Sequence, residues 1–351
     1  MRSGPSPSPD RARYVFRVRI AITGSIATDH LMTFRGRFAD SLVVEQLDKV
    51  SLSFLADDLQ VRRGGVAANI AFGMACLGQR PILVGAVGED FVDYRSWLER
   101  HGVDCESVHV SQSAHTARFV CTTDDDMAQI ATFYAGAMAE ARQIELGPVA
   151  ARVGGLDLVV VGANDPQAML RHTRECRDRG IPFAADPSQQ LAFADGETIR
   201  NLIDGADYLL TNEYEAALTS QKTGWSPEEI AERVTTRVVT RGKDGAVIES
   251  RGAEPIEVPA AREVRRLDPT GVGDAFRAGF LTGLAAGLGH RHAAELGSML
   301  ATYVIETVGT QEYTLGRERF LGRLAEAYGP ESAAEIAPHI GAARPYVASH
   351  P

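Results

Sequence analysis

The amino-acid sequence predicts an α/β fold: a mostly parallel central sheet with helices on both faces, which makes three layers, and a small β-sheet lid. Two observations predict it. Apolar strand-like runs alternate with helical segments along most of the 351 residues, and two stretches that interrupt this alternation contain only short β-type runs. The composition agrees, since 44% hydrophobic residues suffice for the core of one large domain.

The predicted elements follow one another in β-α-β-α order. We expect a buried strand at Val18–Thr23, a helix of small residues at Val66–Leu77, a strand at Pro81–Val87 and an amphipathic helix at Phe91–His101. The order returns after a break, with strands at Leu156–Gly162, Phe183–Asp186, Tyr208–Asn212 and Val238–Thr240, a helix at Pro166–Arg179, and helices throughout Asp274–Tyr328.

The two interruptions are Leu47–Val61 and Val108–Tyr134. We interpret them as one lid built from two separated parts of the chain, about residues 29–62 and 105–135. Leu31–Gln46 has no clear pattern and is expected to be a connection. Residues 1–13 are rich in Pro and Ser and lack the apolar segment of a signal peptide, so we expect a disordered tail before a domain at residues 14–345.

Charge and cysteine content restrict the class of partner. The net charge is -10 and the 36 Lys and Arg residues form no block, which argues against nucleic acid or an anionic membrane as a partner. The four cysteines are widely spaced, as expected for reduced thiols in a cytoplasmic protein. The longest uncharged stretches are too short to span a membrane.

The stretch DPTGVGDAFRAGF, residues 268–280, holds the first candidate site. Gly271 and Gly273 permit backbone angles that point successive N–H groups into one concavity at the start of a helix, where a phosphate group binds well. Asp274 in such a concavity would repel a resting phosphate, which suits a base that deprotonates the attacking hydroxyl. An N-terminal helix cap explains Asp274 equally well, and the motif alone leaves both interpretations open.

Other polar segments follow predicted strands or open predicted helices. Gly65 and Asn69 lie at a glycine-rich helix entry, which also suits plain tight packing. Asp29 follows the first strand and could accept hydrogen bonds from sugar hydroxyls or simply belong to a loop. Asn212 and Glu215 have the spacing of a helix capping box, and they also suit a site for Mg-ATP. The segment Thr240–Gly245 is a turn between two β-type runs.

Four of these segments together resemble the ribokinase (PfkB) family of carbohydrate kinases: GGVAANIAF, TNEYEA, VTRGKDGAVI and DPTGVGDAFRAGF. The last departs from the family's D-T-x-G-A-G-D signature at Pro269 and Val272 but keeps its glycines and final Asp. The resemblance implies a ribokinase-like fold and ATP-dependent phosphorylation of a primary alcohol on a sugar or nucleoside. GSIATDHLM, KVSLSFLADDL, HTARF, ADPSQQLA and GTQEY are similar to the ribokinase-type bacterial adenosine kinases, which implies Mg-ATP-dependent transfer to the adenosine 5'-hydroxyl.

The resemblance also implies roles for individual residues. Asp274 would be the base, and Gly271, Val272 and Gly273 the anion hole. Asp29, Gly65 and Asn69 would bind the ribose, while Ser25, Phe119, Phe133, Gln189 and Gln190 would form the nucleoside pocket, with Ser53 contributed across a homodimer that joins through lid strands. Asn212, Thr240, Arg241, Gly242, Lys243, Asp244, Gly245 and Gly273 would bind ATP, and Glu215 would order Mg2+. A monovalent cation such as K+ is a further cofactor that the sequence leaves open.

Phe119 and Phe133 favour a nucleoside over a bare sugar, because facing aromatic rings in the lid could clamp a purine. The alternative is that both rings fill the lid's own core. A sugar kinase of the same family acting on ribose or fructose is the second interpretation of the chain. A catalytically silent nucleoside sensor is a third, and an NAD-linked enzyme is disfavoured because the G-x-G-x-x-G fingerprint is missing.

Overall fold

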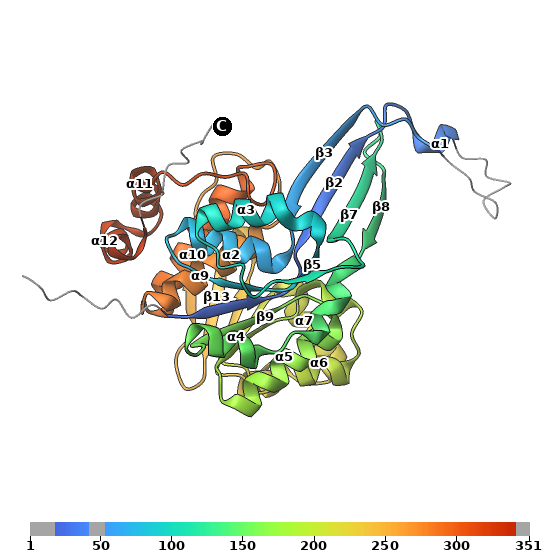
Figure 1. Ribbon diagram of the computed structural model, residues 1–351. Coiled ribbons are helices and arrows are strands. Elements are labelled where there is room, and N and C mark those ends of the chain that lie inside the picture. The colour runs from blue at the N-terminus through green and yellow to red at the C-terminus, as the bar shows by residue number, and fades with distance from the viewer. Residues whose placement is uncertain (1–17, 42–52, 342–351) are drawn as a thin grey trace, which may run out of the picture.

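The computed structural model describes residues 18–41 and 53–341. Its centre is an eight-stranded sheet with the order β14-β13-β12-β11-β10-β9-β1-β4 (Figure 1). The strands are β1 Ile20–Thr23, β4 Ile82–Val84, β9 Leu158–Gly162, β10 Phe183–Asp186, β11 Tyr208–Asn212, β12 Thr236–Thr240, β13 Ala246–Ser250 and β14 Ile256–Val258. Strands β4 to β12 in this order pair in parallel, and β13 and β14 join antiparallel at the edge.

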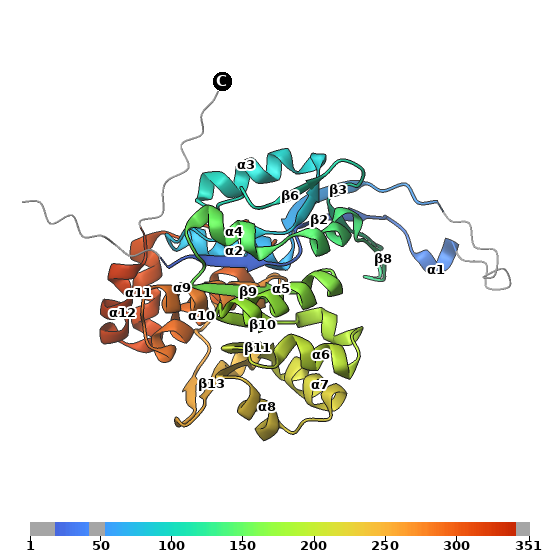
Figure 2. The ribbon, with the colours of Figure 1, turned by 60° about the horizontal axis from the view of Figure 1, so that its bottom comes forward.

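Helices cover both faces of this sheet. Alternate residues of each strand point to opposite sides, and both sets are apolar, so each face needs a covering layer. Ile22 and Val160 belong to one apolar cluster with residues of α2 and α9, while the neighbouring Ala21 and Val159 belong to a second cluster. The first face carries α2 Val66–Cys76, α9 Val272–Ala285 and α10 His290–Ile305, and the second carries α4 Leu146–Val153, α5 Pro166–Arg179 and α6 Gly196–Ile203 (Figure 2). The predicted three-layer arrangement is confirmed.

The remaining helices lie around these layers. They are α1 Phe38–Ser41, α3 Val92–His101, α7 Glu213–Thr223, α8 Pro227–Arg233, α11 Arg317–Tyr328 and α12 Pro330–Ile336, with 3-10 turns η2 Glu89–Phe91, η3 Gly136–Gln143, η4 Ser188–Ala192, η5 Gly242–Asp244 and η6 Ala337–His339. Sequence patterns did not find α4, α6, α7 or α8, and three of these helices have only seven or eight residues.

A second, four-stranded sheet projects from the body with the order β3-β2-β7-β8 (Figure 1). Its strands are β2 Ala27–Thr33, β3 Asp58–Gly64, β7 Ala117–Thr123 and β8 Gln129–Tyr134. Two distant parts of the chain therefore build one small sheet, as predicted, and we refer to it as the lid sheet. The prediction of a connection at Leu31–Gln46 is wrong in two places. Its first residues belong to β2, which extends to Thr33, and Phe38–Ser41 forms the short helix α1.

The predicted strand at Pro81–Val87 is interrupted. It forms β4 and β5 Ala86–Gly88, and β5 leaves the central sheet to pair with β6 His109–Ser111. The break falls at Gly85, where a β-carbon would lie 2.8 Å from the carbonyl oxygen of Gly24. The close approach of two backbones at that point redirects the chain.

Some predictions fall wholly or partly outside the described residues. The tail at residues 1–13 and the first part of the interruption at Leu47–Val61 lie there, and the domain boundary at residues 14–345 stays a prediction. Cys76, Cys105, Cys121 and Cys176 are free thiols. Within residues 18–41 and 53–341, we find no helix whose length and hydropathy would let it cross a bilayer.

Candidate active site

Several of the predicted site residues lie at the carboxyl edge of the central sheet. Asp186, Asn212 and Thr240 are the last residues of β10, β11 and β12, and Asn212 pairs with Thr240. The amino end of α9 reaches the same edge, because its Arg277 contacts Asp186. Ligands of open α/β sheets bind at this edge, where the loops that follow neighbouring strands diverge.

Helix α9 starts with an unusual backbone conformation that only glycine adopts readily. Gly271 is the N-cap residue with φ 75°, and a β-carbon on it would lie 2.8 Å from Cγ2 of Thr310. Val272 and Gly273 are the first two helical residues, so their N–H groups have no partner inside the helix. Asp274 is the third helical residue and makes no capping bond, so the cap interpretation of Asp274 is wrong.

Asp274 is held from α2 and surrounded by charge. Its Oδ2 accepts a hydrogen bond of 2.8 Å from Nδ2 of Asn69. Burial raises the pKa of Asp274 to about 6, with the Arg277 guanidinium and the Asn69 amide lowering it and the Asp186 and Glu215 carboxylates raising it further. A carboxyl group with this pKa is ionised at neutral pH and binds a proton more readily than an ordinary Asp, as a general base requires.

Arg277 is the counter-ion of this site, and sequence reasoning missed it. Its Nε lies 2.6 Å from Oδ2 of Asp186, whose side chain is fully buried, and its Nη2 lies 3.6 Å from Oε2 of Glu215. Burial lowers the pKa of Arg277, but the carboxylates of Asp186, Glu215 and Asp274 raise it above its ordinary value. The one available signal was an arginine among the apolar residues of α9, between Phe276 and Phe280.

Ser188 also lies in this cluster. Its φ of 44° is rare for a residue with a side chain, and its hydroxyl donates a hydrogen bond of 2.7 Å to Oδ1 of Asp186. The bond fixes the orientation of the Asp186 carboxylate opposite Arg277. A strained backbone at this place indicates that the surrounding structure holds these groups firmly.

Asn212 and Glu215 form the capping box of α7, as their spacing predicted. Oδ1 of Asn212 accepts from the N–H of Glu215, and Oε2 of Glu215 accepts from the N–H of Asn212, both at 2.8 Å. Burial raises the pKa of Glu215, while Arg277 lowers it. Among the residues that the structure describes, no three His, Cys, Asp or Glu side chains are grouped to hold a metal ion. Glu215 is a single carboxylate, so a Mg2+ ion held there would take its other ligands from water and nucleotide phosphates.

The turn at Thr240–Gly245 joins β12 to β13, as predicted. The N–H of Arg241 donates to the carbonyl of Gly245 at 2.7 Å, and Gly242–Asp244 is the 3-10 turn η5. Gly245 has φ 87°, and a β-carbon on it would lie 2.0 Å from the carbonyl oxygen of Val258. Lys243 and Asp244 are exposed, so this turn presents polar side chains beside Asn212.

Asp29 lies on β2 of the lid sheet, where its Oδ2 would be 2.9 Å from a β-carbon on Gly64. Burial raises the pKa of Asp29 to about 6, the neighbouring Asp268 raises it further, and Arg62 lowers it. Gly65, with φ 98°, opens α2, and a β-carbon on it would lie 2.6 Å from the carbonyl oxygen of Ser25. The Ser25 hydroxyl accepts a hydrogen bond of 3.0 Å from the N–H of Val66, so Ser25 orients the start of α2.

The strand register places four side chains in one row across the lid sheet. Arg62 pairs with Asp29, Asp29 with Phe119, and Phe119 with Phe133. Directly paired residues point to the same face of a sheet, so a carboxylate and two aromatic rings line one surface. The rings lie side by side and form one wall, which corrects the prediction that they face each other as a clamp.

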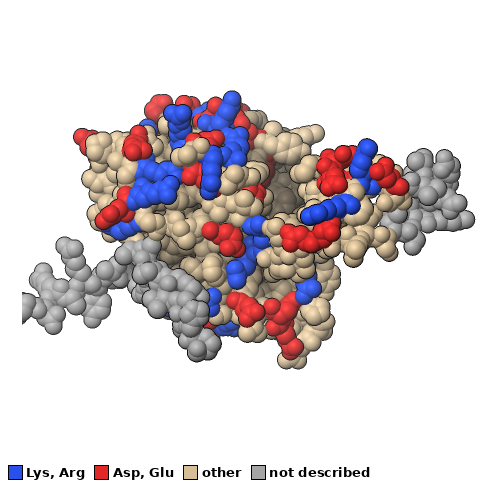
Figure 3. Space-filling view, turned by 90° about the horizontal axis from the view of Figure 1, so that it is seen from above, with Lys and Arg blue, Asp and Glu red and all other residues tan. Residues whose placement is uncertain are grey.

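The remaining predicted residues are less closely connected. Gln190 donates from Nε2 to the carbonyl of Asn164 at 2.8 Å, while Gln189 is exposed. Ser53 is exposed ahead of β3, and among the described residues it makes no hydrogen bond with the other predicted site residues. The space-filling view shows a hollow between the body and the lid sheet, with acidic and basic side chains around it (Figure 3).

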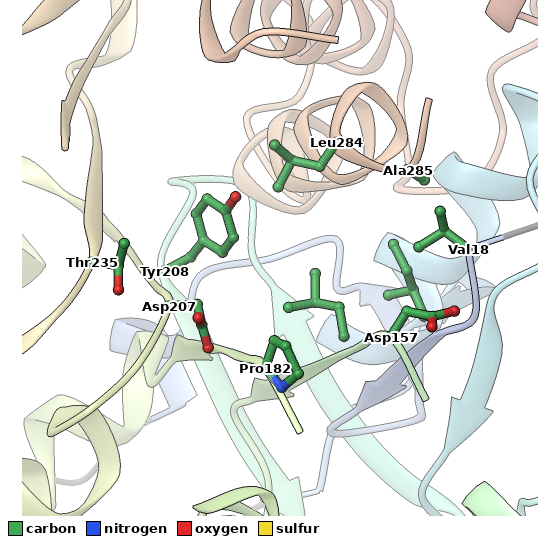
Figure 4. A pocket seen from close by; sticks show the side chains of 10 residues that line it. Val18, Asp157, Pro182, Asp207, Tyr208, Thr235, Leu284 and Ala285 are labelled. Atoms are coloured by element: carbon green, nitrogen blue, oxygen red, sulfur yellow. The ribbon is translucent and has the colours of Figure 1, made fainter. Parts of the chain in front are cut away.

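A separate cavity of about 260 Å³ lies at the opposite edge of the sheet (Figure 4). Pro182, Asp207 and Thr235, which line it, each precede one of the strands β10, β11 and β12. This cavity is therefore distinct from the site at the carboxyl edge.

Comparison with known proteins agrees with this geometry. The sequence matches the family model described as pfkB family carbohydrate kinase over residues 26–315. The chain belongs to the PfkB family. It therefore has the ribokinase-like fold, and it is a phosphotransferase that acts on a hydroxyl group.

Several relatives within the family are similar over most of their length. The nucleoside kinase of Burkholderia thailandensis in its ligand-free form is 38% identical, with a TM-score of 0.79 over 87% of this chain and 99% of that chain. Its complex with inosine is 37% identical, with a TM-score of 0.77 over 88% and 99%. The nucleoside kinase of Methanothermobacter thermautotrophicus is 32% identical over 251 residues, which are 71% of this chain and 80% of that protein.

Proposed function

We propose that this PfkB kinase phosphorylates the 5'-hydroxyl of adenosine with Mg-ATP. The observation that carries the proposal is the position of Asp274, a carboxylate of raised pKa at the amino end of α9, hydrogen-bonded to Asn69. The row of Asp29, Phe119 and Phe133 on the lid sheet supplies a carboxylate for ribose hydroxyls and an aromatic wall for a base.

In the proposed reaction, Asp274 takes the proton of the 5'-hydroxyl as its oxygen attacks the γ-phosphorus of ATP. The N–H groups at the start of α9 stabilise negative charge on the transferring phosphoryl group. Arg277 offsets part of the negative charge of the three carboxylates around it and lowers the pKa of Asp274, which favours the ionised form of Asp274 before the reaction begins. Closure of the lid sheet over the nucleoside would exclude water and suppress hydrolysis of ATP.

The proposed nucleotide site lies beside Asn212 and the Thr240–Gly245 turn. Glu215 would hold Mg2+ through water. The bound ion would neutralise phosphate charge and orient the γ-phosphoryl group. The exposed Lys243 lies in the same turn, where it could contact the nucleotide.

Two observations favour a nucleoside over a free sugar. Phe133 is 53% exposed on the lid sheet, so its ring has a free face on which a flat base could stack. The relatives named above are nucleoside kinases, and the structure of one of them was solved in complex with inosine. Inosine is therefore the second candidate substrate, and ribose, as in the ribokinase of Bacillus subtilis with 25% identity, is the third.

The proposal includes a homodimer joined through the lid sheets. The face opposite Asp29 and Phe119 carries exposed apolar side chains, with Leu59 at 56%, Val61 at 58% and Ile130 at 47%. Exposed apolar faces and unpaired edge strands commonly mark association surfaces. Val61→Glu should convert the dimer to a monomer in analytical ultracentrifugation, and a wild-type monomer would refute the proposed dimer.

One assay tests the function. The protein is incubated with MgATP and with adenosine, inosine, guanosine, ribose or fructose, with and without K+, and the phosphorylated products are separated. We expect the highest kcat/KM with adenosine. Preference for inosine would leave a nucleoside kinase with a different base specificity, whereas phosphorylation of ribose or fructose alone would refute the proposal. Binding of nucleosides without any product would indicate a sensor. The cytoplasm, which supplies ATP and nucleosides, is the proposed location.

A further inference from the structure

A buried network of amide and ring groups connects Asp274 to α3. Gln311 is 1% exposed, Tyr94 5% and Asn69 7%, and they come from three separate parts of the chain. Nε2 of Gln311 donates to Oδ1 of Asn69 at 3.0 Å and to the hydroxyl of Tyr94 at 2.6 Å. Oε1 of Gln311 accepts from Nε1 of Trp97 at 3.2 Å. Gln311 belongs to the GTQEY segment, to which no role has been assigned above.

The direction of these hydrogen bonds is determined at Trp97, because an indole N–H donates and never accepts. Its ring is held in place by packing, with the Arg63 guanidinium 4.3 Å above it and Phe72 stacked at 5.8 Å. Oε1 of Gln311 must therefore face Trp97, and the Gln311 amide nitrogen must face Asn69 and Tyr94. Tyr94 in turn donates to the carbonyl of Gly64 at 2.9 Å, which agrees with this orientation.

The same logic then determines the orientation of Asn69. Because its Oδ1 accepts from Gln311, its Nδ2 faces Asp274 and donates to the carboxylate at 2.8 Å. A reversed Asn69 would place a carbonyl oxygen against this carboxylate, with repulsion on both sides of the amide. The Thr310 hydroxyl does not determine the choice. It lies 2.8 Å from the carbonyl of Arg63 and 2.9 Å from Oδ1 of Asn69, and its single proton serves one of them.

We propose that Trp97 and Gln311 are positioning residues for the reaction: they hold the Asn69 amide with its NH2 group toward Asp274, and through it they hold the Asp274 carboxylate. The hydrogen bond occupies Oδ2 of Asp274 and leaves the other oxygen to take the proton of the substrate hydroxyl. This inference rests on the proposed function, since it assigns Asp274 the role of base. Neither Trp97 nor Gln311 needs to touch the substrate.

The first test removes only the donor that sets the direction. Trp97→Phe keeps an aromatic ring for Arg63 and Phe72 but has no N–H, so Gln311 and Asn69 lose their fixed orientation. We expect kcat to fall about tenfold, because the weakened Asn69–Asp274 contact is roughly one hydrogen bond to a charged group. KM for ATP should stay unchanged. Trp225→Phe is the matched control at the other tryptophan. Trp225 follows the carboxyl end of α7, whereas Asn212 precedes its amino end.

A double-mutant cycle separates positioning from general damage. In an Asn69→Ala background the relay has no target, so Trp97→Phe should cause no further loss of kcat. An unchanged kcat for Trp97→Phe in the wild-type background would overturn the proposal, and so would an equal loss in both backgrounds. If the wild-type chain phosphorylates no nucleoside or sugar, the proposed function fails.

A spectroscopic test does not depend on activity. The chain has two tryptophans, so a 15N-labelled sample gives two indole N–H signals, and Trp97→Phe identifies one of them. Gln311→Met, which preserves side-chain length but accepts no comparable bond, should shift the Trp97 signal and accelerate its exchange with water. Gln143→Met, at an exposed position, should not. An unmoved Trp97 signal in Gln311→Met would overturn the proposal even if Trp97→Phe proved too unstable to assay.

Discussion

Replacing Asp274 with Asn tests the central claim about the site, because the change preserves shape but removes both the charge and the ability to take a proton. The ordinary pKa of 3.8 rises to about 6 at this position, chiefly through burial. At about 1.4 kcal/mol for each pKa unit, holding the ionised carboxylate costs up to about 3 kcal/mol. Partial exposure of the side chain and the loss of one carboxylate beside Arg277 reduce the expected gain on substitution to roughly 1–2 kcal/mol.

The sign of the pH dependence follows from the direction of the shift. Since folding raises the pKa, the folded protein binds this proton more tightly than the unfolded chain does. The cost is therefore absent below about pH 4, grows between about pH 4 and 6, and is complete above that range. Asp274→Asn should then raise the free energy of unfolding at about pH 8 and leave it nearly unchanged at about pH 4.

Two measurements on one pair of proteins check this prediction. In the wild type, kcat/KM should fall about tenfold per pH unit below about pH 6, whereas Asp274→Asn should lose roughly 100-fold or more in kcat and the acid limb with it. Urea unfolding at both pH values gives the stability difference. A variant with near wild-type turnover would show that Asp274 is not the base. A variant that is clearly less stable at about pH 8 would show that the carboxylate is net stabilising, contrary to the raised pKa.

Three further predictions concern the surroundings of Asp274. Arg277→Met should lower the free energy of unfolding by about 3–5 kcal/mol, because it leaves the buried Asp186 unpaired. The control Arg95→Met, in the exposed pair with Glu99, should cost at most about 1 kcal/mol. Equal losses for the two variants in urea unfolding would contradict the central role of Arg277. Phe133→Ala should raise the nucleoside Kd about five- to tenfold without changing the ATP Kd, and Tyr134→Ala, on the opposite face of the strand, should change neither in calorimetry. Asp29→Ala should raise KM for the nucleoside by roughly tenfold or more at an unchanged KM for ATP, and an equal rise for both would indicate a general defect of the lid sheet.

Local signals were sufficient for several parts of the molecule. The alternation of apolar runs predicted the parallel sheet and helices on both of its faces, although it missed α4 and α6 on the second face. The spacing of Asn212 and Glu215 predicted the capping box that α7 has. These features depend on residues close together in the chain, where periodicity and backbone chemistry act directly. The break in the strand at Gly85 was not predictable, because it depends on the close approach of the Gly85 backbone to the carbonyl oxygen of Gly24, which is distant in the sequence.

The site required tertiary structure at the points where charge and direction matter. The segment DPTGVGDAFRAGF by itself presented Asp274 as a helix cap or a base. The structure removes the first alternative, because Gly271 takes the cap position, and the role as base stays a proposal. The raised pKa comes from burial and from Asp186 and Glu215, which are distant in sequence. In the same way, the sequence determined that the lid carries Phe119 and Phe133, but only the register of β7 and β8 placed both rings on one face, because neighbours across a sheet are set by pairing and not by order along the chain.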